Sequence, residues 1–156
     1  MRLLRRFPVL MAVLAVSTVG LAGSAAFVQT TNTRHVATLH STMTGANEVP
    51  GPGDPNASGS TVIVLNANSG TVCYVIRVSG ISSPITAGHI HVGDATVAGP
   101  VVIPFPLIGG PNTFAGCTTA DKTLIQNIID NPSGYYTNVH NAPFPKGVMR
   151  GQLQPF

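Results

Sequence analysis

Short runs of β-branched and aromatic residues, separated by clusters of turn residues, are the feature that most constrains this fold. Residues 61–65 read Thr-Val-Ile-Val-Leu, and residues 71–78 read Thr-Val-Cys-Tyr-Val-Ile-Arg-Val. The Asn-Ala-Asn-Ser-Gly segment between them is rich in turn formers, so the two runs are predicted to form a β-hairpin. Many short strands at this spacing predict a mainly β fold, a β-sandwich of Greek-key type. The other expected extended runs are a Thr-rich segment that begins at residue 35 and residues 87–92, 100–105, 114–117, 135–141 and 148–153.

Two segments carry more specific signals. Residues 122–130 place four aliphatic side chains on one helical face and predict a single short helix, with Pro132 just beyond its end. Thr118 and Asp121 have the spacing of a capping box before that helix. The prolines of residues 100–105 have no backbone N–H to donate to a neighbouring strand. This run is therefore expected at a sheet edge.

The N-terminal residues have the layout of a secretory signal. Three arginines within the first six residues precede an apolar stretch at residues 7–22, and small residues follow at 23–26. We therefore expect residues 1–26 to be a cleaved signal peptide, residues 27–36 a flexible stub and residues 37–156 the folded domain. The alternative is an uncleaved membrane anchor, but a spanning helix needs about 20 apolar residues. The mature chain is thus expected to be secreted or associated with the cell envelope, with no membrane span.

The basic charge of the chain belongs to the predicted signal. The whole chain has eight Lys and Arg against five Asp and Glu. Removing the three arginines of the first six residues leaves five basic and five acidic residues. The mature domain therefore has no net charge, and its composition gives no support for nucleic-acid binding.

The chain contains two cysteines, Cys73 and Cys117. In an oxidising compartment an even pair of this kind predicts one disulfide. The alternative, a pair of thiolate metal ligands, has weaker support because neither cysteine has a second Cys or His two to four residues away.

Three histidines are the candidate site residues. In a strand His89 and His91 point to one face and Ile90 to the other, and His140 at the end of another extended run could join them. Three imidazoles could bind copper or zinc. They could equally make hydrogen bonds that pin loops to the sheet, or contact a ligand or partner. The sequence leaves these three interpretations open.

The sequence gives little support for a hydrolytic enzyme. The chain has no Gly-x-Ser-x-Gly motif, and its five carboxylates are scattered. The sequence therefore favours a non-catalytic protein, with redox chemistry at a bound metal as the one enzymatic alternative.

Five motifs follow one another along the chain: Thr44–Pro50, Ala87–His91, Gly99–Val102, Tyr136–His140 and Arg150–Leu153. In this order they resemble the CHRD domain, a module named from chordin that also occurs in secreted bacterial proteins. The resemblance extends from about Thr38 to Leu153. It implies an extracellular, immunoglobulin-like β-sandwich that acts as a non-catalytic binding or structural module, with an extracellular protein or surface component as its partner. The chain departs from the family at Val148, where the motif usually has Glu.

Glu48 and Arg150 lie in the first and last of these motifs. We expect them to form a structural ion pair that ties the first strand region to the last. The alternative is that they are two independent surface charges, because exposed ion pairs contribute little to stability.

A shorter resemblance suggests an alternative function. Residues 89–94 resemble the copper-ligand strand of copper/zinc superoxide dismutases, which implies a copper- or zinc-binding β-sandwich with dismutase-like redox activity. No bridging histidine follows, so His35 or His40 would have to complete such a copper site.

Overall fold

The computed structural model describes residues 34–156, which form a mainly β structure with one α-helix. The predicted signal peptide and most of the predicted stub lie outside the described residues. The first strand already begins at Val36, the last residue of that stub. The elements are β1 (Val36–Thr44), β2 (Ser58–Asn66), β3 (Thr71–Ser79), β4 (Ile85–Val92), β5 (Val101–Pro104), β6 (Gly109–Gly110), β7 (Thr113–Thr119), α1 (Lys122–Asp130), β8 (Tyr135–Asn141), β9 (Met149–Gln152) and β10 (Gln154–Pro155), with 3-10 turns at Gly45–Asn47 and Pro132–Gly134.

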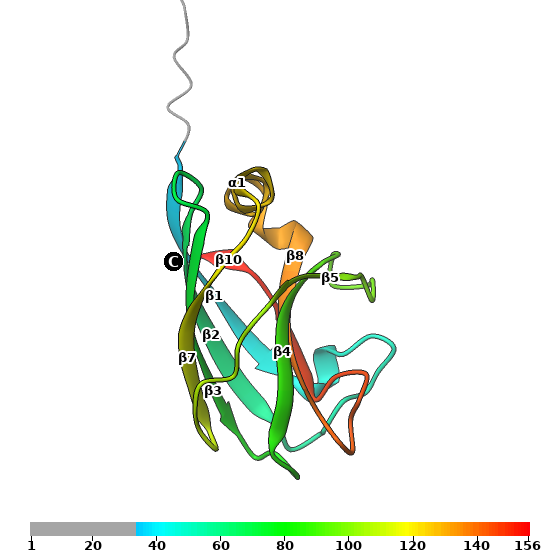
Figure 1. Ribbon diagram of the computed structural model, residues 1–156. Helices are drawn as coiled ribbons and strands as arrows, with labels where there is room; N and C mark the ends of the chain where they lie inside the picture. Colours follow the sequence, from blue (N-terminus) through cyan, green and yellow to red (C-terminus); the bar gives the residue numbers. More distant parts are fainter. Residues whose placement is uncertain (1–33) are drawn as a thin grey trace, which may run out of the picture. The chain divides into compact units, whose positions relative to one another are not determined.

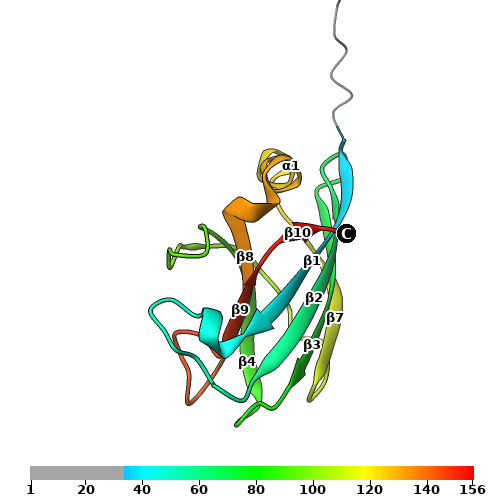
Figure 2. The same cartoon turned by 180° about the vertical axis from the view of Figure 1, so that it is seen from behind.

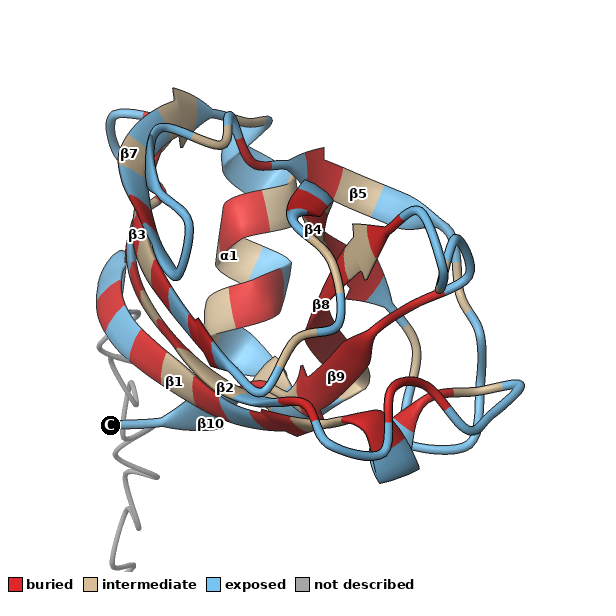
Figure 3. Ribbon diagram, turned by 90° about the horizontal axis from the view of Figure 1, so that it is seen from below, coloured by how far each residue is buried: buried red, intermediate tan, exposed pale blue. Residues whose placement is uncertain are grey.

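All strands belong to one antiparallel sheet. Its order is β5-β4-β8-β9-β1-β2-β3-β7-β6, and β10 pairs with β1. The sheet curls so that β1, β2, β3 and β7 face β4, β8 and β9 (Figure 3). Only one residue pair, Thr44 with Arg150, joins β1 to β9. The predicted mainly β class is confirmed, and this curled sheet is consistent with the expected Greek-key sandwich.

The predicted hairpin and edge strand are both confirmed. β2 and β3 pair along their full length, from Ser58 opposite Ser79 to Asn66 opposite Thr71. β5 is the terminal strand of the sheet and contains Pro104. A proline can sit there because an edge strand leaves one row of its backbone donors unpaired.

The hydrophobic core fills the space inside the curl. Alternate residues of β1, β2 and β3 point inward, as the two-residue period of a strand requires. Leu39, Ile63 and Ile76 are almost fully buried there, and Ile90 of β4 belongs to the same buried cluster. Burial of these aliphatic side chains is the main force that holds the two halves together.

Helix α1 covers the end of the curl where β1 starts (Figures 1 and 2). Its bounds agree with the predicted residues 122–130, and Ile125 and Ile128 are fully buried. The predicted role of Thr118 in the cap is wrong, because that residue belongs to β7. Asp121 alone is the N-cap, and its Oδ1 accepts a hydrogen bond from the Leu124 N–H at 2.9 Å. Within residues 34–156, no helix has the length and apolar character needed to cross a membrane.

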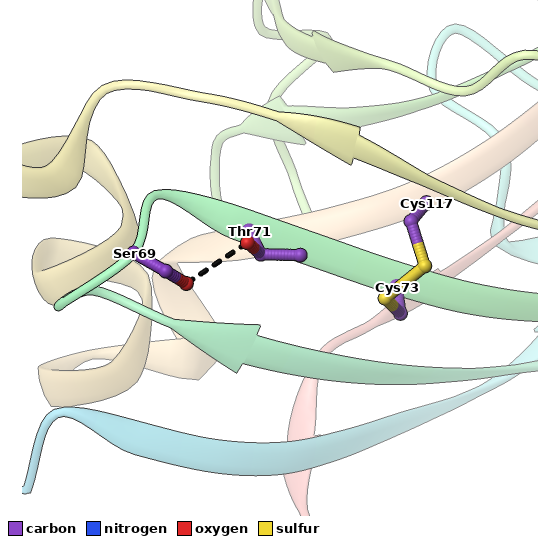
Figure 4. Close-up of a disulfide and its surroundings, with 4 residues drawn as sticks. All are labelled: Ser69, Thr71, Cys73 and Cys117. Carbon is purple, nitrogen blue, oxygen red and sulfur yellow. Dashed lines mark hydrogen bonds between the residues drawn. A yellow bond between two sulfur atoms is a disulfide. The ribbon is translucent and has the colours of Figure 1, made fainter.

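Cys73 and Cys117 form the predicted disulfide. The two residues are direct partners in the β3–β7 ladder, so the disulfide staples two neighbouring strands (Figure 4). It closes a loop with a sequence separation of 44 residues, which contains β4, β5 and the connections between them. In the unfolded chain the disulfide therefore keeps the two ends of the segment that carries His89 and His91 close together.

Replacing both cysteines by alanine should lower the free energy of unfolding by about 4 kcal/mol, because the cross-link restricts the unfolded chain. Urea unfolding monitored by circular dichroism measures this change. The wild-type protein in reducing agent serves as the control and should match the double variant. Equal stability of the variant and the oxidised wild type would contradict the prediction.

Candidate functional site

The histidines lie on the face of the sheet opposite the core. Ile90 points into the core and is fully buried, so its neighbours His89 and His91 point to the outer face of β4. The loops that follow β1, β4 and β8 lie on this same outer side (Figures 1 and 2). They shield the histidines from solvent, and His91 is only 7 % exposed.

Strand register brings three motifs to one place. His89 of β4 lies opposite Asn138 of β8, which in turn lies opposite Arg150 of β9. His91 lies opposite Tyr136 in the same way. Residues 136, 138 and 140 alternate with inward-pointing neighbours, so they share the outer face with the two histidines of β4. β8 is consequently buried on both faces, as Figure 3 shows.

Three histidines meet there. One ring nitrogen from each of His89, His91 and His140 lies within 4.8 Å of the others. The ring centroids are 5.0 Å apart for His89 and His140 and 5.4 Å apart for His89 and His91. His35 and His40, the residues expected to complete a copper site, lie elsewhere. His35 contacts Gln126, and His40 packs against Phe156.

Backbone carbonyls set the tautomers of two rings. Nδ1 of His91 donates to the Gly99 carbonyl at 2.9 Å, and Nδ1 of His140 donates to the Pro145 carbonyl at 3.1 Å. A carbonyl oxygen can only accept, so each neutral ring carries its proton on Nδ1 and a lone pair on Nε2. These bonds also pin the loops that follow β4 and β8. Nδ1 of His89 and Nε2 of His91 are buried and have no hydrogen-bond partner.

The histidines are neutral at physiological pH. Burial, together with the charges that His140 and His91 would carry, lowers the pKa of His89 to about 4. Burial also lowers the pKa of His91 and of His140. Desolvation disfavours the charged imidazolium, so the ring lone pairs are available to a Lewis acid.

Arg150 is fully buried beside the histidines, with 1 % of its surface exposed. Its guanidinium donates to the Val97 and Asp94 carbonyls at 2.9 and 2.7 Å. Its Cζ lies 3.5 Å from the centroid of the Tyr136 ring, and Tyr136 stacks on His91 at a centroid distance of 4.8 Å. Arg150, Tyr136 and His91 therefore form a three-layer stack, and the same arginine holds the loop after β4 whose Gly99 carbonyl orients His91.

Glu48 is buried on the same outer face, with 6 % exposure, and its Oε1 has no hydrogen-bond partner. A Cβ on Gly147 would collide with this carboxyl group, so glycine is required there for the loop to close on it. Burial raises the pKa of Glu48 to about 7, although the Arg150 charge acts in the opposite direction. The two groups therefore interact electrostatically, but the hydrogen bonds of Arg150 go to Asp94, Val97 and Gln152. Their ion pair stays a prediction.

Glu48 and Arg150 also line an open cleft of about 440 Å³, to whose walls none of the three histidines contributes.

A comparison with models of known protein families agrees with the way in which the sequence motifs of β4, β8 and β9 come together in the fold. The model of the CHRD domain family matches residues 39–153. The chain belongs to the CHRD family. No curated protein and no solved structure matches it. CHRD membership points to a non-catalytic module, and in this CHRD domain the family-like motifs of β4, β8 and β9 pack together around the histidines.

The sequence pattern alone predicts no individual role for Tyr136 or Asn138. A usable signal was present, because both residues alternate with His140 in an extended run and must share its face. Their neighbours across the sheet depend on the pairing of β8 with β4 and β9, which the sequence does not specify.

Glu48→Gln should remove a pH dependence of stability. An acid whose pKa is raised on folding, here from 4.5 to about 7, holds its proton more tightly in the native state. Its contribution to the free energy of unfolding is complete below pH 4.5 and is lost as the pH rises through 7, a change of about 3 kcal/mol. Urea unfolding of both proteins with a metal chelator, from pH 4.5 to 8, should show Glu48→Gln gaining this much relative to wild type. A difference that does not vary with pH would contradict the prediction.

Proposed function

We propose that this CHRD domain is an extracellular binding module that holds one copper or zinc ion through His89, His91 and His140. One observation carries the proposal: Nδ1 of His89 and Nε2 of His91 are buried without a partner beside a third histidine. Each buried polar atom left unsatisfied costs about 1–3 kcal/mol. A metal ion would satisfy both nitrogens at once.

The chemistry of the donor set fits this assignment. Neutral imidazole is a common ligand of both copper and zinc. Metal-binding histidines usually donate their second ring nitrogen to a carbonyl or carboxylate, as His91 and His140 do here. Two nitrogens bound to one tetrahedral ion at about 2.0–2.1 Å lie about 3.4 Å apart. The present limit of 4.8 Å means that the rings have to approach by up to about 1.4 Å on binding.

The setting supports a module that works outside the cytoplasm. The disulfide between Cys73 and Cys117 is typical of an oxidising compartment, and the N-terminal sequence predicts a secretory signal. Its partner in this proposal is an extracellular protein or surface component. Dismutase-like redox activity remains the alternative if the bound ion is copper.

Metal binding is tested by titrating the purified, chelator-treated protein with zinc and with copper and measuring bound metal after dialysis. We expect one ion per chain in the wild type. His89→Ala, His91→Ala and His140→Ala should each lose stoichiometric binding, because two imidazoles hold an ion far less tightly than three. His35→Ala is the matched control, since His35 lies outside the cluster, and should retain the full load.

Two outcomes would count against the proposal. Absence of stoichiometric metal in the wild type would exclude a metal-binding function, and an unchanged load in the three variants would exclude these residues as the site. If the variants lose thermal stability in the presence of chelator while the wild type takes up no metal, the histidines serve only as hydrogen-bonding groups.

A further inference from the structure

Asn138 lies in the middle of the three histidines. Its side chain is 3 % exposed, and strand register places it between His89 on one neighbouring strand and Arg150 on the other. Oδ1 of Asn138 is 3.1 Å from Nε2 of His140. Across the sheet from Asn138, Nδ1 of His89 is buried without a hydrogen-bond partner, and so is Nε2 of His91 on the same face of β4.

The contact between Asn138 and His140 is not an ordinary hydrogen bond. Nδ1 of His140 gives its proton to the Pro145 carbonyl, so the neutral ring presents a lone pair at Nε2. The carboxamide oxygen also presents lone pairs, and two acceptors that face each other repel. A bound cation between them would turn this repulsion into attraction.

The contact with His140 shows which end of the Asn138 amide faces the histidines. Oδ1 lies 3.1 Å from Nε2 of His140, so the NH₂ group, on the other side of the same planar amide, points away from that ring.

The spacing matches a coordination shell. In a tetrahedral site with bonds of about 2.0 Å, any two ligand atoms lie about 3.3 Å apart. The observed 3.1 Å between Oδ1 of Asn138 and Nε2 of His140 is close to that edge length. The cluster thus offers four candidate donor atoms: three imidazole nitrogens within 4.8 Å of one another and the carboxamide oxygen that contacts one of them.

We infer that Asn138 supplies the fourth ligand and that the site is a closed N₃O site for Zn²⁺. This inference rests on the proposed metal-binding function and narrows it. Zinc accepts nitrogen and oxygen ligands in a tetrahedral arrangement, whereas Cu²⁺ with such ligands prefers a square-planar or tetragonal one. Four protein ligands leave no open position for substrate, and closed tetrahedral sites are structural. The inferred zinc site is therefore a structural one, in keeping with a non-catalytic CHRD module.

The test measures zinc affinity by competition with a chromogenic chelator. Asn138→Ala should weaken zinc binding at least tenfold because a ligand is lost, and Asn138→Asp should retain or strengthen it because a carboxylate replaces the amide oxygen. Asn141→Ala is the matched control. Asn141 is a buried asparagine of the same strand, but its amide bonds to the Ser83 carbonyl, so zinc affinity should not change.

Several outcomes separate this inference from the proposed function. If the wild type binds no zinc, both fail. If the wild type binds zinc through its histidines but Asn138→Ala binds equally or more tightly, Asn138 is no ligand and only this inference is overturned.

Where Asn138→Ala does not fold, Asn138→Asp decides between the alternatives. Retained or tighter zinc binding supports the ligand role, and loss of binding in a folded protein overturns it. Cobalt substitution adds a second measurement. Intense visible absorption bands are expected for a four-coordinate wild-type site, and weak bands of the six-coordinate type would overturn the inference.

Discussion

The buried guanidinium of Arg150 is the constraint on which the outer half of this CHRD domain depends. A charge with 1 % exposure is tolerated only when its donors and its faces are occupied. Here two backbone carbonyls of the loop after β4, the side-chain oxygen of Gln152 and the ring of Tyr136 occupy them. The loop must therefore close over β8 and β9, and its Gly99 carbonyl is thereby placed to orient His91.

Strand β8 separates an apolar environment on its inner side from a polar one on its outer side. On its inner side Val139 belongs to the aliphatic core, where area removed from water provides the stabilisation. On its outer side Tyr136, Asn138 and His140 lie in a polar layer that is almost equally dry, where every unpaired atom carries a cost. Most groups of this layer are paired, and the exceptions are nitrogens of His89 and His91 and Oε1 of Glu48. The unpaired nitrogens lie in the histidine cluster that we propose as the metal site.

The local elements were largely predictable. The hairpin around residues 66–70, the helix at residues 122–130 and the edge position of residues 101–104 each follow from local propensity, period and proline chemistry. The site was predictable only in part. Alternation places His89 and His91 on one face, but it does not say which distant residues lie opposite them. Similarly, Glu48 and Arg150 were expected as partners, yet the guanidinium bonds chiefly to the chain around residues 94–97.

The sequence by itself determined the mainly β class, the disulfide, the strand faces and the CHRD resemblance, because each depends on composition or on short-range period. Only the tertiary structure decided that His140, and not His35 or His40, joins the cluster. It also decided that Asn138 lies between His89 across the sheet and the ring of His140. The physical reason is strand register. The alignment of β4, β8 and β9 is set by core packing on one face and by the burial of Arg150 on the other, and both depend on residues that lie far apart in the sequence.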